Sequence, residues 1–400
     1  MDFNWTEEQK IWRTTVRNFA ERKIKPYVRE IDSNKQIPKK IVEDMAKLGL
    51  FAPTVSQKYG GSEVDWTMAC IAAEELGRAD ISLAVPVLYL VEAAWGHIFH
   101  LYGSDDLKNE YLSNITAGKQ FCGIAVTEPT GGSDIVGAVN TRATKKGKSW
   151  QLSGEKLFIS GITESSTWGG IHLTLARTNP TKDHKGFSFF AIPLKDEAQI
   201  KTTLLEDMGR MGISTGGFVM DDLEVPSHYL IGEENKGFYY AMEGFSLARV
   251  LIGATCIGAA EAAFEMGKEH ITSRSSFGRP IAQYEGIQFP FAEHYTNIES
   301  VKLLTYRAAW LLTQMYQKKQ YTHHDISLAA AMTKLRAPQY AFQVMNEVAD
   351  WLGATGYTKE HDIEMGIRGI RSYSIGAEGT MNIMRIIIAR EVLGKEFLPY

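Results

Sequence analysis

The chain is poor in cysteine. Among its 400 residues only Cys70, Cys122 and Cys256 carry a thiol, and none of them belongs to a CxxC pair. An odd number leaves one thiol over in any disulfide scheme, which argues against the disulfide framework that small secreted domains need. We therefore expect a reduced, cytoplasmic protein.

An excess of one charge is also missing. Lys and Arg total 43 against 47 Asp and Glu, the formal net charge is −4, and no long run of one sign occurs. Because proteins that bind nucleic acid present a basic patch, we expect no nucleic-acid partner. Hydrophobic residues make up 44% of the chain and charged residues 22%, values typical of globular proteins. At roughly 150 residues per domain, the length predicts two or three domains.

No segment has the composition of a membrane span. The most apolar stretch, residues 81–102, is interrupted by Pro86, Glu92, His97 and His100. A span needs about 20 nearly uncharged apolar residues, so a buried core helix fits this stretch better. The first residues lack the apolar core of a signal peptide. We expect neither a transmembrane segment nor export by such a signal.

Two kinds of binding motif are absent as well. No GxGxxG follows a predicted strand, which disfavours a Rossmann unit for a nicotinamide cofactor. The adjacent residues His323 and His324 point in different directions on a helix, and no cluster of compatible ligands accompanies them or the pair His361 and Asp362. The prediction is that the protein has no metal site.

The spacing of apolar residues divides the chain into three parts. The capping-box pattern Thr6-Glu7-Glu8-Gln9 begins a helix that Pro26 stops, and helical spacing continues to about residue 120. The period then changes to two, with Gly, Ser, Thr and Pro at the turns, which predicts an antiparallel sheet or barrel. Helical patterns return near residues 238–273, 285–318, 326–351 and 381–393, and they predict a four-helix bundle with a kink or local end at Pro338.

These patterns predict a mainly α protein with a central β-barrel domain. The predicted domains are an N-terminal helical domain over residues 1–120, a middle β-barrel domain over 121–235 and a C-terminal four-helix bundle over 236–400. The order α, then β, then α is not that of a doubly wound parallel sheet.

Two segments have the residues of a binding or catalytic site. Residues 125–134 leave a strand and enter a Gly-rich turn, whose N–H groups and hydroxyls suit a polar ring edge or a phosphate, although ordinary turn chemistry explains the composition equally well. Near the end of the chain, Glu378 lies between glycine-containing segments at the start of the last helix. An acid there is either a reactive carboxylate or a helix-start residue favoured by the macrodipole.

Taken together and in order, eight short segments resemble the acyl-CoA dehydrogenase family of flavoproteins along essentially the whole chain. The segments are Ala125-Val126-Thr127-Glu128-Pro129 with Gly132-Ser133-Asp134, Phe158-Ile159-Ser160, Glu206-Asp207-Met208-Gly209, Val225-Pro226 with Leu230-Ile231-Gly232-Glu233, Arg274-Ser275-Ser276-Phe277-Gly278-Arg279-Pro280-Ile281, Leu352-Gly353, Glu378-Gly379-Thr380 and Ile388-Ala389-Arg390. Each segment is a weak signal alone, and the ordered set is specific. The resemblance implies a helical domain, a β-barrel and a C-terminal four-helix bundle, assembled as a homotetramer.

The resemblance also implies FAD as cofactor and assigns residues to it. The matching cofactor-contact positions are Val126, Thr127, Phe158, Ile159, Ser160, Arg274, Phe277, Asp350, Gly353, Ala354, Thr380 and Asn382. Of these, Arg274 and Phe277 match residues that reach the cofactor of a neighbouring subunit. Ser133, Arg249 and Gly379 match positions near the acyl-CoA ligand, and Glu378 matches the catalytic base.

The implied reaction is α,β-dehydrogenation of an acyl-CoA thioester to the trans-2-enoyl-CoA. Glu378 would remove the α-proton, flavin N5 would accept the β-hydride, and an electron-transfer flavoprotein would reoxidise the cofactor. Burial by a bound acyl chain is expected to raise the pKa of this base. One residue more than the family usually has stands between Arg368 and Glu378, and Ala248 offers no substitute acid at the alternative base position.

Other functions remain open at this point. A flavin oxidase or hydroxylase on the same scaffold would use similar residues, and a non-catalytic acyl-CoA-binding homologue could keep FAD for structure alone. The acyl group could be straight, branched, cyclic or aryl. Ala84 stands where dicarboxylyl-CoA members place an arginine, so a free distal carboxylate is not expected on the substrate.

Overall fold

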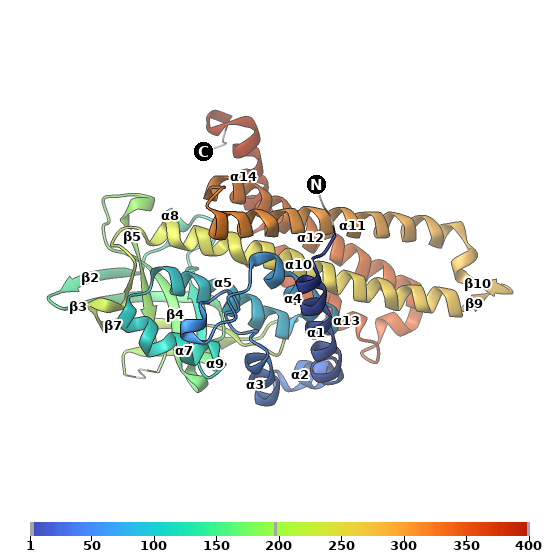
Figure 1. Ribbon diagram of the computed structural model, residues 1–400, viewed down its shortest axis with the longest axis horizontal. Helices are drawn as coiled ribbons and strands as arrows, with labels where there is room; N and C mark the ends of the chain where they lie inside the picture. The colour runs from blue at the N-terminus through green and yellow to red at the C-terminus, as the bar shows by residue number, and fades with distance from the viewer. Residues whose placement is uncertain (1–3, 196–197, 398–400) are drawn as a thin grey trace.

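A computed structural model describes residues 4–195 and 198–397 (Figure 1). The sheet occupies one end of the elongated molecule, and long helices run from it toward the other end. The long helices are α10 (Gly237–Ser273), α11 (Glu285–Thr313) and α12 (His323–Leu352). The mainly α fold with a central sheet matches the prediction.

The N-terminal part is helical, as its apolar spacing predicts. Helix α1 (Glu7–Lys23) begins with the expected capping box: the Gln9 N–H donates to Thr6 Oγ1 at 3.2 Å, and the Thr6 N–H donates to Gln9 Oε1 at 3.1 Å. The helix ends before Pro26. The helices that follow are α2 (Val28–Asn34), α3 (Lys39–Lys47), α4 (Trp66–Ala79), α5 (Ala84–Tyr102), α6 (Asp105–Leu107) and α7 (Ser113–Thr116).

The most apolar stretch of the N-terminal part forms helix α5 in the protein interior. Two helices, α5 and α10, are long and apolar enough to cross a membrane by length and composition. Their most apolar windows are 89% and 94% buried inside the protein. Both are therefore core helices of this fold, and the prediction for residues 81–102 is confirmed.

The middle part forms a sheet of eight strands in the order β6-β7-β3-β2-β4-β5-β8, with β1 paired to β4. The strands are β1 (Phe121–Ala125), β2 (Arg142–Lys146), β3 (Ser149–Ser160), β4 (Gly170–Arg177), β5 (Phe187–Ile192), β6 (Ile200–Leu205), β7 (Thr215–Pro226) and β8 (Leu230–Ile231), with short helices α8 (Ile135–Ala138) and α9 (Ile162–Trp168) between them. Most pairs are antiparallel, as expected. The pairings of β1 and β2 with β4 are parallel, because long connections separate these strands in sequence.

The C-terminal part contains one helix that the apolar spacing did not predict. Helix α13 (Ile363–Ile375) precedes α14 (Met381–Leu393) and packs on the bundle. Its interior glycines, Gly366 and Gly369, lower its helix propensity. They permit close packing, since a Cβ on Gly369 would lie 2.3 Å from the Ser82 carbonyl oxygen. Helix α12 continues through Pro338, so the local end considered for that position does not occur.

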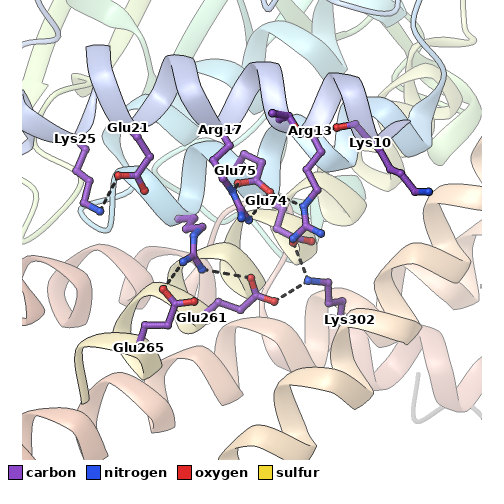
Figure 2. Close-up of polar contacts among 12 residues, drawn as sticks. Lys10, Arg13, Arg17, Glu21, Lys25, Glu74, Glu75, Glu261, Glu265 and Lys302 are labelled. Carbon is purple, nitrogen blue, oxygen red and sulfur yellow. Dashed lines mark hydrogen bonds and ion pairs between the residues drawn. The ribbon is translucent and has the colours of Figure 1, made fainter. Parts of the chain in front are cut away.

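A network of buried ion pairs joins the N-terminal helices to the bundle (Figure 2). Glu74 and Glu75 on α4 are each 1% exposed. Arg13 and Arg17 of α1 donate to Glu75 at 2.7 Å, and Lys302 of α11 donates to Glu74 at 2.8 Å. Each buried carboxylate thus has at least one cationic partner, which buried charges require. The network holds α1 against α4 and the bundle.

Candidate active site

Glu378 lies in a tight turn between α13 and α14. Three consecutive residues have left-handed backbones, with φ of 37° at Ala377, 56° at Glu378 and 106° at Gly379. A non-glycine residue in this region costs roughly 1–2 kcal/mol, so contacts elsewhere must hold the turn. Thr380 closes it as the N-cap of α14, where its hydroxyl accepts from the Ile383 N–H at 3.3 Å.

Two buried cations hold the backbone of this turn. Arg249 of α10 is 5% exposed, and its Nε donates to the Glu378 carbonyl oxygen at 2.8 Å. Lys334 of α12 is fully buried, and its Nζ donates to the carbonyl oxygens of Tyr373, Gly376 and Gly379. Sequence reasoning found Arg249 but missed Lys334, because a lysine whose partners are backbone carbonyls leaves no side-chain pattern in the sequence.

The Glu378 carboxylate is suited to accept a proton. It is partly buried, and it forms no ion pair with any side chain of residues 4–195 or 198–397. Burial raises its pKa above the ordinary carboxyl value, although the charges of Arg249 and Lys334 oppose that rise. Burial likewise lowers the pKa of Arg249 to about 10. A carboxylate with a raised pKa beside fixed cations has the electrostatics of a general base.

Arg210 brings the end of strand β3 into the same region as Glu378. Its Nη1 donates to Ser160 Oγ and its Nη2 to Thr215 Oγ1, both at 3.0 Å. The Arg210 charge also lowers the pKa of Glu378. Because a guanidinium only donates, the Ser160 oxygen accepts from it. The Ser160 hydroxyl donates to no residue within 4–195 or 198–397, so its proton can face a ligand. Arg210 is a second site residue that sequence reasoning missed.

The remaining predicted residues of β3 have contrasting exposures. Phe158 is 64% exposed and has a φ of 61°, whereas Ile159 is buried. The pairing of β3 with β7 shifts between Leu157 and Ile159, and this irregularity turns Phe158 outward. An exposed ring on an otherwise ordered strand fits a surface that a large planar ligand covers.

A buried ion pair supports the segment that contains Val126 and Thr127. Lys156, fully buried on β3, donates to Glu128 Oε1 at 2.8 Å and to the Val126 carbonyl oxygen at 3.2 Å. Val126 is buried. The hydroxyls of Thr127 and Ser133 receive no hydrogen-bond partner from the part of the chain that the structure describes. They remain available to a ligand.

A second group of predicted cofactor residues lies elsewhere. Arg274 and Phe277 belong to the hairpin of β9 (Ser275–Ser276) and β10 (Arg279–Pro280), which Figure 1 places at the end of the molecule opposite the sheet. Phe277 is 96% exposed. The exposed residues Asp350, Gly353 and Ala354 follow at the end of α12. The structure thus separates this group from Ser160 within one chain.

The last predicted residues lie beside Glu378. Thr380 caps α14, and Gly379 is close enough to Arg249 that a Cβ there would lie 3.3 Å from Arg249 Nη2. Asn382 is exposed on α14, where its Oδ1 accepts from Arg385 at 2.8 Å. Across residues 4–195 and 198–397, no group of three or more His, Cys, Asp or Glu side chains could hold a metal ion. The three cysteines are buried and free.

Comparison with known proteins identifies the family. Sequence models of the acyl-CoA dehydrogenase N-terminal, middle and C-terminal domains match residues 6–119, 123–223 and 235–393. The chain therefore belongs to the acyl-CoA dehydrogenase family, whose enzymes are oxidoreductases that act on CH–CH donors. The resemblance drawn from its sequence motifs is confirmed.

Relatives match along nearly the whole chain. A 3-(aryl)acrylate reductase of Clostridium sporogenes is 32% identical over 97% of this chain and 99% of its own length. A cyclohex-1-ene-1-carbonyl-CoA dehydrogenase of Syntrophus aciditrophicus is 34% identical over 97% of this chain and 90% of its own. The structure of a glutaryl-coenzyme A dehydrogenase with glutaryl-CoA superposes with a TM-score of 0.91 at 29% identity, covering 98% of this chain and 97% of the other.

Proposed function

We propose that this protein is an FAD-dependent acyl-CoA dehydrogenase that converts an acyl-CoA thioester to the trans-2-enoyl-CoA, with Glu378 as the base. The observation that carries the proposal is the Glu378 turn. Its carboxylate has a raised pKa and no ion-pair partner among the described residues, while Arg249 and Lys334 hold its backbone. Such a group can take a proton from carbon without first breaking a strong ion pair.

The residues near the sheet fit the flavin. Ser160 offers a hydroxyl proton, Thr127 offers a hydroxyl that has no partner among the described residues, and Phe158 offers an exposed ring face. When bound, FAD supplies the acceptor for the β-hydride at its N5 atom. Arg274 and Phe277 stand at the β9–β10 hairpin, at the end of the molecule opposite the sheet, and Asp350 to Ala354 stand at the end of α12. We propose that they contact the cofactor of a second subunit, in the homotetramer that the family resemblance implies.

The chain's own residues account for proton transfer. A thioester carbonyl acidifies the α-carbon only modestly, so the base must lie within hydrogen-bond reach and the developing charge on the carbonyl oxygen must be stabilised. A Glu378 carboxylate oxygen takes the α-proton, and the β-hydrogen leaves with the electron pair of its C–H bond. The Glu378 N–H, which family resemblance assigns to the thioester oxygen, stabilises the enolate-like charge. Arg249 fixes the carbonyl of the same residue.

We further propose a cytoplasmic enzyme that passes its electrons to an electron-transfer flavoprotein. Its domains are taken as residues 1–120, 121–235 and 236–400. Glu378 does not determine the acyl group. The names of two relatives refer to an aryl and a cyclic compound, so both kinds of acyl group are candidates. Ser133 and Arg249 are proposed as contacts near the thioester. These assignments rest on the family resemblance and on the position of each residue.

The experiment is anaerobic mixing of the yellow protein with straight, branched, cyclic and aryl acyl-CoA thioesters, followed by flavin absorbance. At least one thioester should bleach the flavin. Glu378→Gln should retain FAD and bind the thioester but lose flavin reduction by roughly 1,000-fold or more, since the proton acceptor is gone. Glu299→Gln, an exposed change on α11, is the matched control and should reduce its flavin normally.

Three results would contradict the proposal. Normal flavin reduction in Glu378→Gln would remove the base assignment. Tight thioester binding with no bleaching across the panel would favour a non-catalytic homologue. Rapid reoxidation of the reduced protein by air, with peroxide formed, would favour an oxidase or hydroxylase.

A further inference from the structure

Lys334 is a buried lysine without an acidic partner. It lies on α12 at 0% exposure and forms no ion pair with any residue that the structure describes. Its Nζ instead donates to the carbonyl oxygens of Tyr373 at 2.5 Å, Gly379 at 3.2 Å and Gly376 at 3.4 Å. An ammonium has three donors, and all three are used on one short segment. Packing alone does not require such a residue, because a buried charge is costly and an apolar side chain is not.

The three carbonyls enclose the proposed base. Tyr373 belongs to the last turn of α13, and Gly376 and Gly379 stand on either side of Ala377 and Glu378. Both enclosed residues have left-handed backbones. A helix end and a left-handed turn leave carbonyl oxygens without intrahelical partners. Lys334 donates hydrogen bonds to three of these oxygens.

The geometry of this turn gives the lysine a specific task. Ala377 and Glu378 both hold left-handed backbones, which are costly for non-glycine residues unless contacts fix them. We propose that Lys334 is a positioning residue whose hydrogen bonds hold this turn and set the Glu378 carboxylate where it accepts the α-proton. The proposal rests on the proposed function, in which Glu378 is the base.

Charged groups on neighbouring elements define the electrostatics of Lys334. Burial lowers its pKa to about 8, while Cys256 of α10 and Glu378 favour its charged form and Arg249 of α10 opposes it. The Lys334 charge in turn lowers the pKa of Glu378. Loss of the Lys334 proton therefore weakens three bonds to the turn and raises the proton affinity of the base.

The test compares Lys334→Met with the wild-type holoenzyme. Methionine has a similar length but no donor, so the variant should retain FAD and bind an unreactive thioether analogue of the substrate within a few-fold. Its single-turnover flavin reduction should fall roughly 10- to 100-fold, because small displacements of a reacting group have effects of this size. The wild-type rate should decline above a pH of about 8. Lys334→Met should lack this decline, and its acid limb should move to higher pH.

Two further variants separate positioning from general destabilisation. Lys334→Gln keeps amide donors without the charge and should recover part of the reduction rate without the alkaline decline. Lys302→Met disturbs the ion network of Figure 2 and should lower stability without moving either pH limb.

The outcomes distinguish this inference from the proposed function. Wild-type rate and pH profile in the Lys334 variants, with activity lost in Glu378→Gln, would overturn the positioning role alone. Normal reduction in Glu378→Gln would overturn the proposed function itself. If Lys334→Met does not fold, a wild-type pH profile in Lys334→Gln overturns the inference.

Discussion

The ion pair of Glu128 and Lys156 gives a quantitative prediction about the segment that contains Val126 and Thr127. Glu128 is 5% exposed and accepts four hydrogen bonds: from Lys156 Nζ at 2.8 Å, Thr141 Oγ1 at 2.6 Å, the Thr141 N–H at 3.0 Å and the Asn140 N–H at 2.7 Å. Burial opposes its charge, but Lys156 and these bonds outweigh burial and lower its pKa. The change Glu128→Gln removes the charge and turns an NH2 group toward one of these donors.

Breaking one side of a buried ion pair costs about 3–5 kcal/mol, because the other charge stays buried. At roughly 2–4 °C per kcal/mol for a domain of 150–250 residues, the thermal midpoint should fall by about 6–20 °C. Flavin content, measured as the ratio of flavin to protein absorbance, should fall with it, since the Val126 carbonyl oxygen is one of the Lys156 partners. In the double variant with Lys156→Met, part of the stability should return, because no uncompensated charge remains.

The same pair predicts a pH dependence. Burial lowers the pKa of Lys156 to about 8 from its ordinary 10.5, so the unfolded chain binds more protons between these values. The contribution of this group to stability therefore rises with pH across that window. In Glu128→Gln the rise should begin at lower pH, because the carboxylate no longer holds the proton on Lys156. An unchanged midpoint in Glu128→Gln, or a double variant less stable than either single variant, would refute this reasoning.

Three further variants test packing and assembly. A Cβ on Gly258 of α10 would lie 1.9 Å from the Glu74 carbonyl oxygen, so Gly258→Ala should destabilise the protein by about 1–3 kcal/mol in denaturant unfolding. A Cβ on Gly286 of α11 would meet nothing within 4 Å, so Gly286→Ala should stabilise the protein by about 0.5–1 kcal/mol. Phe277→Ala removes an exposed ring from the β9–β10 hairpin. The helicity of the subunit should stay unchanged, while the tetramer content measured by light scattering and the FAD content measured by absorbance should fall. Unchanged assembly and FAD content would exclude a role for this ring.

Local signals in the sequence were sufficient to predict most of the helices. The capping box at Thr6 and the apolar period of α10, α11 and α12 depend on residues a few positions apart, so they are visible in sequence. Helix α13 was missed because Gly366 and Gly369 weaken its pattern. Those glycines are explained by close contact with residues more than 280 positions earlier, such as Ser82.

The residues of the candidate site divide in the same way, into those that local motifs indicate and those whose contacts depend on the tertiary fold. The Glu378 and Ser160 segments carry motifs, so the family resemblance could predict them as site residues. Lys334, Arg210 and Lys156 were missed because their partners are backbone carbonyls, hydroxyls or a distant carboxylate. Which atoms such side chains meet depends on the tertiary fold, and no spacing rule in the sequence describes it.

The close contact of α13 with the turn before α5 has a consequence for the substitutions that the protein can accept in evolution. Gly366 packs against Ile81 and Gly369 against Ser82, so the turn before α5 supports the helix that leads to Glu378. Substitutions at Ile81 or Ser82, remote in sequence from Glu378, are therefore expected to shift α13 and, with it, the Glu378 turn. Changes in the turn before α5 are therefore expected to be accompanied by compensating changes in α13.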